Sequence, residues 1–83
     1  MPVTDADLRT PQQDGTDWYA ILDVCYEGYE DLDSGVREYG ESFGIERHEI
    51  LQRTGPAGGW PVVKYVGTYN QIKALLDTYF ADN

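Results

Sequence analysis

A helix start can be recognised in the sequence at Thr68 to Gln71. The pattern Thr-x-x-Gln is a capping box, in which the threonine and glutamine side chains bond to free backbone N–H groups of the first helical turn. Apolar residues follow it at the spacing of one helical face. These residues are Ile72, Leu75, Leu76, Tyr79 and Phe80. We therefore expect an amphipathic C-terminal helix, which packs through this face on the rest of the chain.

A strand is expected earlier in the chain, from Trp18 to Tyr26. This segment is rich in aromatic and branched residues, which favour β-structure. Both of its faces are largely apolar, so the pattern predicts cover on both sides of the strand. Cys25 is then expected to be buried, where a thiol behaves as a small apolar group and is unreactive.

A second amphipathic helix is expected after this strand. Its apolar residues recur every three or four positions. They are Leu32, Val36, Tyr39 and Phe43. Asp31 or Asp33 can cap its start, and Gly44 can end it in a left-handed turn. Gly35 and Gly40 each weaken such a helix by up to about 1 kcal/mol relative to alanine.

Two further strands complete the pattern. Residues 45–53 alternate between charged and apolar side chains, as in a strand near a sheet edge with one solvated face. Residues 60–66 form an apolar strand, and the glycine-rich segment 55–59 is expected to join the two as a hairpin. Residues 1–16 are expected to be a flexible arm, with a short turn of helix near Asp5 to Arg9, before one domain over residues 17–83.

The resulting order, strand-helix-strand-strand-helix, predicts a small α+β fold. A right-handed crossover and a hairpin give a three-stranded antiparallel or mixed sheet in spatial order 1-3-2. Both helices are expected on one face, as in half of a ferredoxin-like fold. The strand at 18–26 then lies at a free edge, and the open sheet face shows several aromatic residues. Such edges and patches commonly bind another chain.

The acidic residues are concentrated in one part of the chain. The net charge is −9, and nine carboxylates lie between Asp23 and Glu49 against two cations, Arg37 and Arg47. This charge repels nucleic acid and anionic lipid and favours cationic protein surfaces. Three interpretations stay open: a solvated helix face, a mimic of nucleic-acid phosphates, and a cation site. The third is the weakest, because Asp31-x-Asp33 is followed by Gly35 and lacks the remaining ligands of a calcium loop.

No group of residues predicts catalysis. His48 has no recognisable nucleophile or orienting partner, and the single cysteine cannot form a Cys-x-x-Cys redox motif. The segment 55–59 lacks the lysine and helix cap of a phosphate-binding loop. We therefore expect no enzymatic activity, no cofactor and no metal. The lack of a secretion signal or a membrane-spanning apolar run favours a cytoplasmic location.

The sequence favours a small acidic protein-binding module that occupies a basic surface on a larger nucleic-acid-binding protein, with no direct contact to nucleic acid or membrane. Its most concrete form is a phage or mobile-element inhibitor of the anti-CRISPR or anti-restriction type. Two tyrosines are candidate anchors, although the many aromatics could equally fill the core. The expected partner-binding residues are Glu27, Tyr29, Glu30, Asp31, Asp33, Glu38, Tyr39 and Glu41. The alternative is an assembly protein that forms homodimers or larger oligomers through strand 18–26 or the open sheet face.

Overall fold

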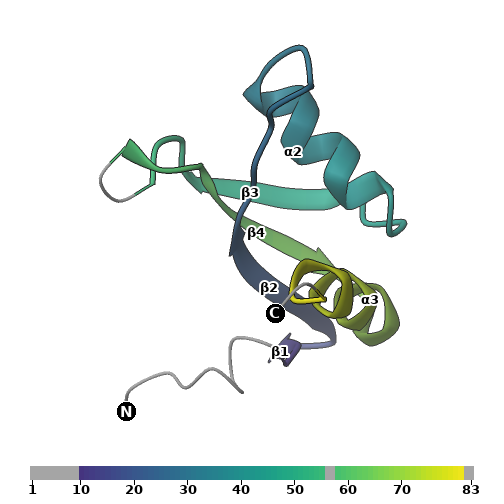
Figure 1. The fold of residues 1–83 in the computed structure, drawn as a ribbon. Coiled ribbons are helices and arrows are strands. Elements are labelled where there is room, and N and C mark those ends of the chain that lie inside the picture. The colour runs from purple at the N-terminus through teal and green to yellow at the C-terminus, as the bar shows by residue number, and fades with distance from the viewer. Residues whose placement is uncertain (1–9, 56–57, 82–83) are drawn as a thin grey trace.

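The computed structural model describes residues 10–55 and 58–81, and within these it contains two helices and four strands (Figure 1). In chain order they are β1 (Gln12–Asp14), β2 (Asp17–Asp23), α2 (Leu32–Glu41), β3 (Arg47–Gln52), β4 (Val62–Gly67) and α3 (Tyr69–Tyr79). The expected α+β class is confirmed. Neither described helix has the length and apolarity that a membrane crossing needs.

The sheet has the strand order β1-β2-β4-β3, and every neighbouring pair is antiparallel. The central strand β4 pairs with β2, where Ala20 lies opposite Tyr65, and with β3 on its other side. The order expected for the strands at 18–26, 45–53 and 60–66 is therefore confirmed. Since β2 and β3 are both antiparallel to β4, they run parallel to each other, and α2 makes the crossover between them.

The sheet has four strands rather than three because β1 is added beside β2. Gln12 lies opposite Tyr19 and Asp14 opposite Asp17. The turn between them contains Gly15 with a φ of +65°, a conformation that glycine adopts without a steric cost. The short sequence Gln-Gln-Asp contains none of the β-branched or aromatic residues that favour strands, so a strand is not predicted there.

The expectation of a flexible arm over residues 1–16 is therefore wrong for the residues of β1. Residues 12–14 belong to the sheet, and Pro11 beside them is buried. The turn of helix expected near Asp5 to Arg9 lies outside the described residues. The expectation that strand 18–26 has a free edge is also corrected, since β1 covers the first part of β2.

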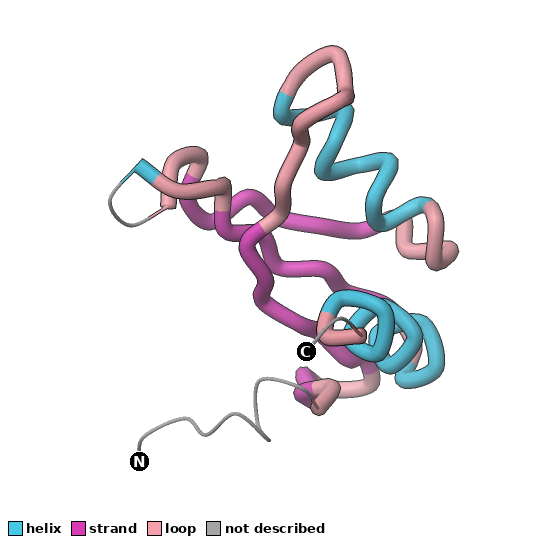
Figure 2. Tube along the Cα trace, viewed as in Figure 1, coloured by secondary structure: helices cyan, strands magenta, loops and turns pink. Residues whose placement is uncertain are grey.

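Both helices pack on one face of the sheet and form a single core with it (Figure 2). Tyr65 of β4 is fully buried at the centre of this face, and its hydroxyl donates a hydrogen bond to the Val36 carbonyl of α2 over 2.6 Å. Gly40 allows this close approach, because a Cβ there would lie 2.8 Å from the Tyr65 ring. The buried apolar residues are Ala20, Leu22, Val24, Val36, Ile45, Val63, Tyr65, Ile72, Leu75 and Leu76.

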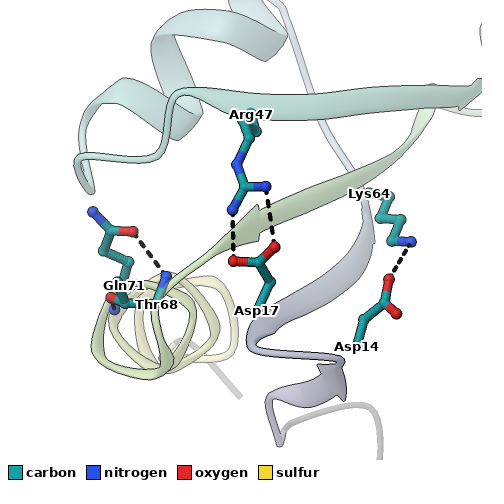
Figure 3. Close-up of polar contacts among 6 residues, drawn as sticks. All are labelled: Asp14, Asp17, Arg47, Lys64, Thr68 and Gln71. Atoms are coloured by element: carbon teal, nitrogen blue, oxygen red, sulfur yellow. Dashed lines mark hydrogen bonds and ion pairs between the residues drawn. The ribbon is translucent and has the colours of Figure 1, made fainter.

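The opposite face of the sheet is open and more polar than the sequence predicts. Arg47 reaches across β4 to Asp17 with two hydrogen bonds of 2.8 and 3.1 Å (Figure 3). Lys64 lies 4.6 Å above the ring of Tyr19, the one aromatic residue of the described strands whose alternation places it on this face. Ile21 is 45% exposed.

Two expectations for the segment 18–26 are therefore wrong. Cover on both sides is absent, since no described helix packs on the open face. Cys25 lies beyond the end of β2 and is exposed rather than buried. The segment is apolar on both faces, but Tyr19 and Ile21 gain only partial cover from neighbouring side chains of the sheet.

The helix ends follow the sequence closely. At the start of α3, the Thr68 hydroxyl accepts from the Gln71 backbone N–H, and the Gln71 side-chain oxygen accepts from the Thr68 N–H, so the capping box is confirmed. Of the two acids expected as caps of α2, Asp31 fills that position and accepts from the Ser34 N–H over 2.8 Å. Gly44, with a φ of +76°, lies in the left-handed turn after α2.

Candidate functional site

Every lysine and arginine within residues 10–55 and 58–81 forms an ion pair with a carboxylate. The pairs are Arg37–Glu41, Arg47–Asp17, Arg53–Asp33, Lys64–Asp14 and Lys73–Asp77. The partners are mostly solvent-exposed, so each pair contributes little to stability. The ion pairs matter more for the surface charge than for stability, because they leave no described cation without a carboxylate partner.

The carboxylates without an ion pair all lie in one part of the described chain. They are Asp23, Glu27, Glu30, Asp31, Glu38, Glu46 and Glu49. Asp23 is bonded to the hydroxyl of Tyr79, and Asp31 caps α2. The remaining side chains belong to exposed residues and extend into solvent. The excess negative charge of the described residues is thus located between Asp23 and Glu49.

The loop at residues 24–31 and the exposed side of α2 together carry Glu27, Glu30, Asp31 and Glu38, and we call this region the acidic surface. The loop lies directly against the helix, because a Cβ on Gly35 would come within 2.5 Å of the Tyr26 Cβ. In Figure 1 this loop leads from the end of β2 to the start of α2. The loop acids are therefore held near the N-terminal end of α2, where the helix dipole favours negative charge.

Asp33 and Glu41 also face solvent on α2, but both have cationic partners. Arg53, from the segment after β3, donates two hydrogen bonds of 3.2 Å to Asp33. Arg37 lies 3.7 Å from Glu41, one helical turn away. Of the six acids expected to bind a partner, these two form ion pairs with described cations, whereas the four acids of the acidic surface do not, although Arg37 and Arg53 lie near enough to Asp31 to lower its pKa.

The two tyrosines expected as anchors lie in different environments. Tyr29 is 42% exposed on the loop, at the acidic surface. Tyr39 is half-buried, with its ring 5.6 Å from that of Phe43 and 6.1 Å from that of Tyr65. Burial raises the pKa of the Tyr39 hydroxyl. Tyr39 therefore packs against the core, and Tyr29 is the better placed of the two for contact with a partner.

The structure adds an aromatic residue that the sequence does not place at this site. Trp60, just before β4, packs edge to face on Tyr26 of the loop, with ring centroids 5.4 Å apart, and is itself 40% exposed. The expected strand order places the segments 18–26 and 60–66 side by side, but the hydrophobic pattern does not supply the register that brings Tyr26 and Trp60 together.

The charge state of Asp31 follows from its capping role. The backbone N–H of Ser34, followed by the Ser34 hydroxyl, lowers the pKa of the Asp31 carboxyl. A carboxylate that accepts such bonds stays ionised to lower pH than a free aspartate. Asp31 therefore contributes its negative charge to the acidic surface down to lower pH than a free aspartate would.

The described residues also contain features outside the acidic surface. His48 is half-buried, and its ring lies 6.0 Å from that of Tyr65. A groove of about 240 Å³ is lined by Asp17, Glu46, Arg47, Thr68 and Gln71 among others. Arg47 bonds to Asp17 and Gln71 to Thr68, whereas Glu46 has no ion pair among the residues that the structure describes (Figure 3). No group of three or more potential metal-binding side chains occurs in the described part of the chain.

Comparison with protein-family models, curated proteins and solved structures finds no match to this chain. The chemistry of its own surface is therefore the basis for a functional proposal.

Proposed function

We propose that this chain is a non-enzymatic protein-binding module, which uses its acidic surface to occupy a basic nucleic-acid-binding surface of a larger protein. The supporting observation is the charge distribution. Every described lysine and arginine is paired, and the acids that remain unpaired all lie between Asp23 and Glu49. A surface that carries more negative than positive groups is suited to a cationic partner.

The acidic surface shares with a row of phosphate groups the sign of its charge and the presence of several negative groups. Glu38 lies seven positions after Asp31, which is about 10 Å along the helix, and Glu27 and Glu30 lie on the loop before it. A helix with acids on its exposed side and on the preceding loop can therefore place several negative groups against a groove that normally binds phosphates. Docking of this kind releases counterions and weakens as salt increases.

Displacement of nucleic acid tests the proposal. Labelled double-stranded DNA is bound to purified restriction endonucleases, RNA-guided nucleases and histone-like proteins, and this chain is added as competitor while fluorescence anisotropy is measured. We expect displacement from at least one of these proteins, with an apparent affinity that falls by about ten-fold or more between 50 and 500 mM salt. Failure to displace DNA from any of them, or displacement that is independent of salt, contradicts the proposal.

A matched pair of variants separates docking through the acidic surface from an effect of net charge. Glu27→Gln with Glu30→Gln neutralises two acids of the loop, and Glu46→Gln with Glu49→Gln neutralises two unpaired acids elsewhere. Glu46 lies beyond the C-terminal end of α2, about 15 Å of helix away from the loop. The first variant is expected to displace DNA several-fold less well than the second. Equal losses would show that only the net charge matters.

Self-association through strand 18–26 or the open sheet face is the alternative, and the structure supports it less well. β1 covers Asp17 to Tyr19 of β2, and Tyr79 bonds to Asp23 at the other end of the strand. The segment left for another strand is short, and two copies with a charge of −9 repel each other. A concentration-dependent dimer in sedimentation velocity would revive this alternative.

A further inference from the structure

We propose that the aromatic pair Tyr26 and Trp60 is the place where the acidic surface receives an arginine side chain of its partner. This inference rests on the proposed function, and it specifies the chemistry that the partner presents. The expected occupant is a guanidinium group that projects from a basic protein surface.

The aromatic pair is held in place by the backbone on both sides. The N–H of Val24 donates to the carbonyl of Pro61 over 3.0 Å, which continues the pairing of β2 with β4 beyond the strand ends. On the other side, Gly55 leaves no space for a side chain, since a Cβ there would lie 2.4 Å from the Trp60 carbonyl oxygen. Figure 2 shows the two loops that supply the rings, one after β2 and one between β3 and β4. The rings are therefore positioned by the fold before a partner arrives.

The geometry of the two rings leaves aromatic surface available. Their planes are inclined at 84°, so the edge of one ring meets the face of the other and the remaining faces are not stacked. Trp60 is 40% exposed. Tyr29, with 42% exposure, lies in the same loop, and its N–H donates to the Tyr26 carbonyl over 3.1 Å. Exposed tryptophan and tyrosine are the residues most often found as anchors in protein interfaces.

No described cation already occupies these rings. Lys64 lies over the ring of Tyr19, which shows that this chain uses the cation–π contact elsewhere. Arg53 lies near enough to the Tyr26 hydroxyl to interact with it electrostatically, but both of its terminal nitrogens bond to Asp33. The residues that follow Tyr26 and Tyr29 in the chain, Glu27 and Glu30, have no ion pair. A cationic side chain from another molecule can therefore meet an aromatic face next to a loop that carries unpaired carboxylates.

An arginine side chain is better suited than a lysine side chain to bind an aromatic face and a carboxylate at the same time. Its planar guanidinium group stacks on an aromatic face and can donate two parallel hydrogen bonds to a carboxylate, whereas the lysine ammonium is a strongly hydrated point charge. Nucleic-acid bases also stack on exposed aromatic rings. Here the neighbouring carboxylates repel the phosphates that accompany those bases, so a basic protein segment is the better match.

Two peptides of equal length and charge test the inference, one with five Arg-Gly repeats and one with five Lys-Gly repeats. Their affinities are measured by fluorescence anisotropy at 50 mM salt. We expect the arginine peptide to bind about three-fold more tightly. Trp60→Leu should remove this preference and leave the lysine affinity unchanged. Tyr69→Ala, which removes an equally exposed aromatic residue from α3, should keep the preference.

A second measurement leaves Trp60 in place. Trp18→Phe makes Trp60 the only tryptophan in the chain, so its emission reports directly on the aromatic pair. We expect the arginine peptide to change this emission and the lysine peptide to change it much less. Equal binding of both peptides, a preference that survives Trp60→Leu in a folded variant, or unchanged Trp60 emission would each overturn the inference. The proposed function fails separately, when the chain does not displace DNA in a salt-dependent way.

Discussion

The hydroxyl of Tyr79, in the last turn of α3, donates a hydrogen bond to the carboxylate of Asp23 at the end of β2. The backbone N–H of Asp23 lies near the same oxygen and partly offsets the rise in the pKa of the Tyr79 hydroxyl. In an antiparallel sheet, the backbone groups of alternate residues point to opposite sides of the strand. Since Val24 faces β4, the N–H of Asp23 points to the outer edge of β2, beyond the end of β1. Tyr79 therefore covers an edge position that would otherwise be available to another strand.

Removal of this hydroxyl should destabilise the fold. Tyr79→Phe is expected to lower the free energy of unfolding by about 1 kcal/mol, because it deletes one hydrogen bond to a carboxylate that is accessible to water. Urea denaturation followed by circular dichroism measures the change. Tyr69→Phe is the control, since the Tyr69 hydroxyl has no hydrogen bond within the described residues and its loss should cost little. Equal losses in the two variants would show that the bond to Asp23 contributes nothing.

Replacement of Gly40 by alanine should also destabilise the fold, contrary to helix propensity. Propensity alone predicts a gain of up to about 1 kcal/mol for a glycine in the middle of a helix. At Gly40, however, the added methyl group would lie 2.8 Å from the ring of the fully buried Tyr65. We expect a net loss of about 1 to 3 kcal/mol from the forced separation of α2 and β4. A urea midpoint above that of the unmodified chain would show that the close packing is not needed.

Gly40 also illustrates which features of the fold the sequence reveals. The destabilising effect of Gly40 on the helix is a local property and can be recognised from the sequence. The reason why a glycine is needed there is the ring of Tyr65, which lies on a strand much later in the chain. The capping box at Thr68 and the apolar helix stripes are likewise local patterns, and the order of the three longer strands follows from the rule for crossover connections. These predictions are confirmed. β1 was missed because its pairing with β2, rather than its own composition, makes it a strand.

The candidate site also has some features that can be predicted from the sequence and others that cannot. Glu27, Glu30 and Asp31 are close together in the chain, so their presence on one loop follows directly from the sequence. The pairing of Asp33 with Arg53 and the contact of Tyr26 with Trp60 depend on how the two loops approach each other. Such contacts between distant segments need the strand register, which the hydrophobic pattern alone does not supply.

Gln71 should contribute more than an ordinary capping residue. Its side-chain oxygen accepts from the Thr68 N–H, while its nitrogen donates to the Gly44 carbonyl over 2.9 Å and so links α3 to the turn after α2. Gln71→Ala removes both bonds and is expected to cost about 2 kcal/mol. Gln71→Glu keeps the bond to Thr68 but cannot donate to Gly44, so we expect an intermediate loss. If glutamate and alanine have the same effect in thermal unfolding, one of the two bonds is not significant.

The stability of the fold should decrease in alkaline solution because of its buried tyrosines. Burial raises the pKa of the Tyr65 hydroxyl above its ordinary value of 10, and burial together with the bond to Asp23 does the same for Tyr79. Above pH 10 the unfolded chain releases these protons while the folded chain retains them, so folding loses stability as pH rises. The contribution is fully present below pH 10 and is lost on the way to the raised folded pKa values.

Urea midpoints measured from pH 8 to 11 check this expectation. We expect little change up to about pH 9 and then a fall of up to about 1.4 kcal/mol per pH unit for the fully buried Tyr65. Tyr65→Phe should be less stable at pH 8, because it loses the hydrogen bond to the Val36 carbonyl, and should also show a shallower fall above pH 10. An unchanged alkaline slope in this variant would mean that other groups cause the pH dependence.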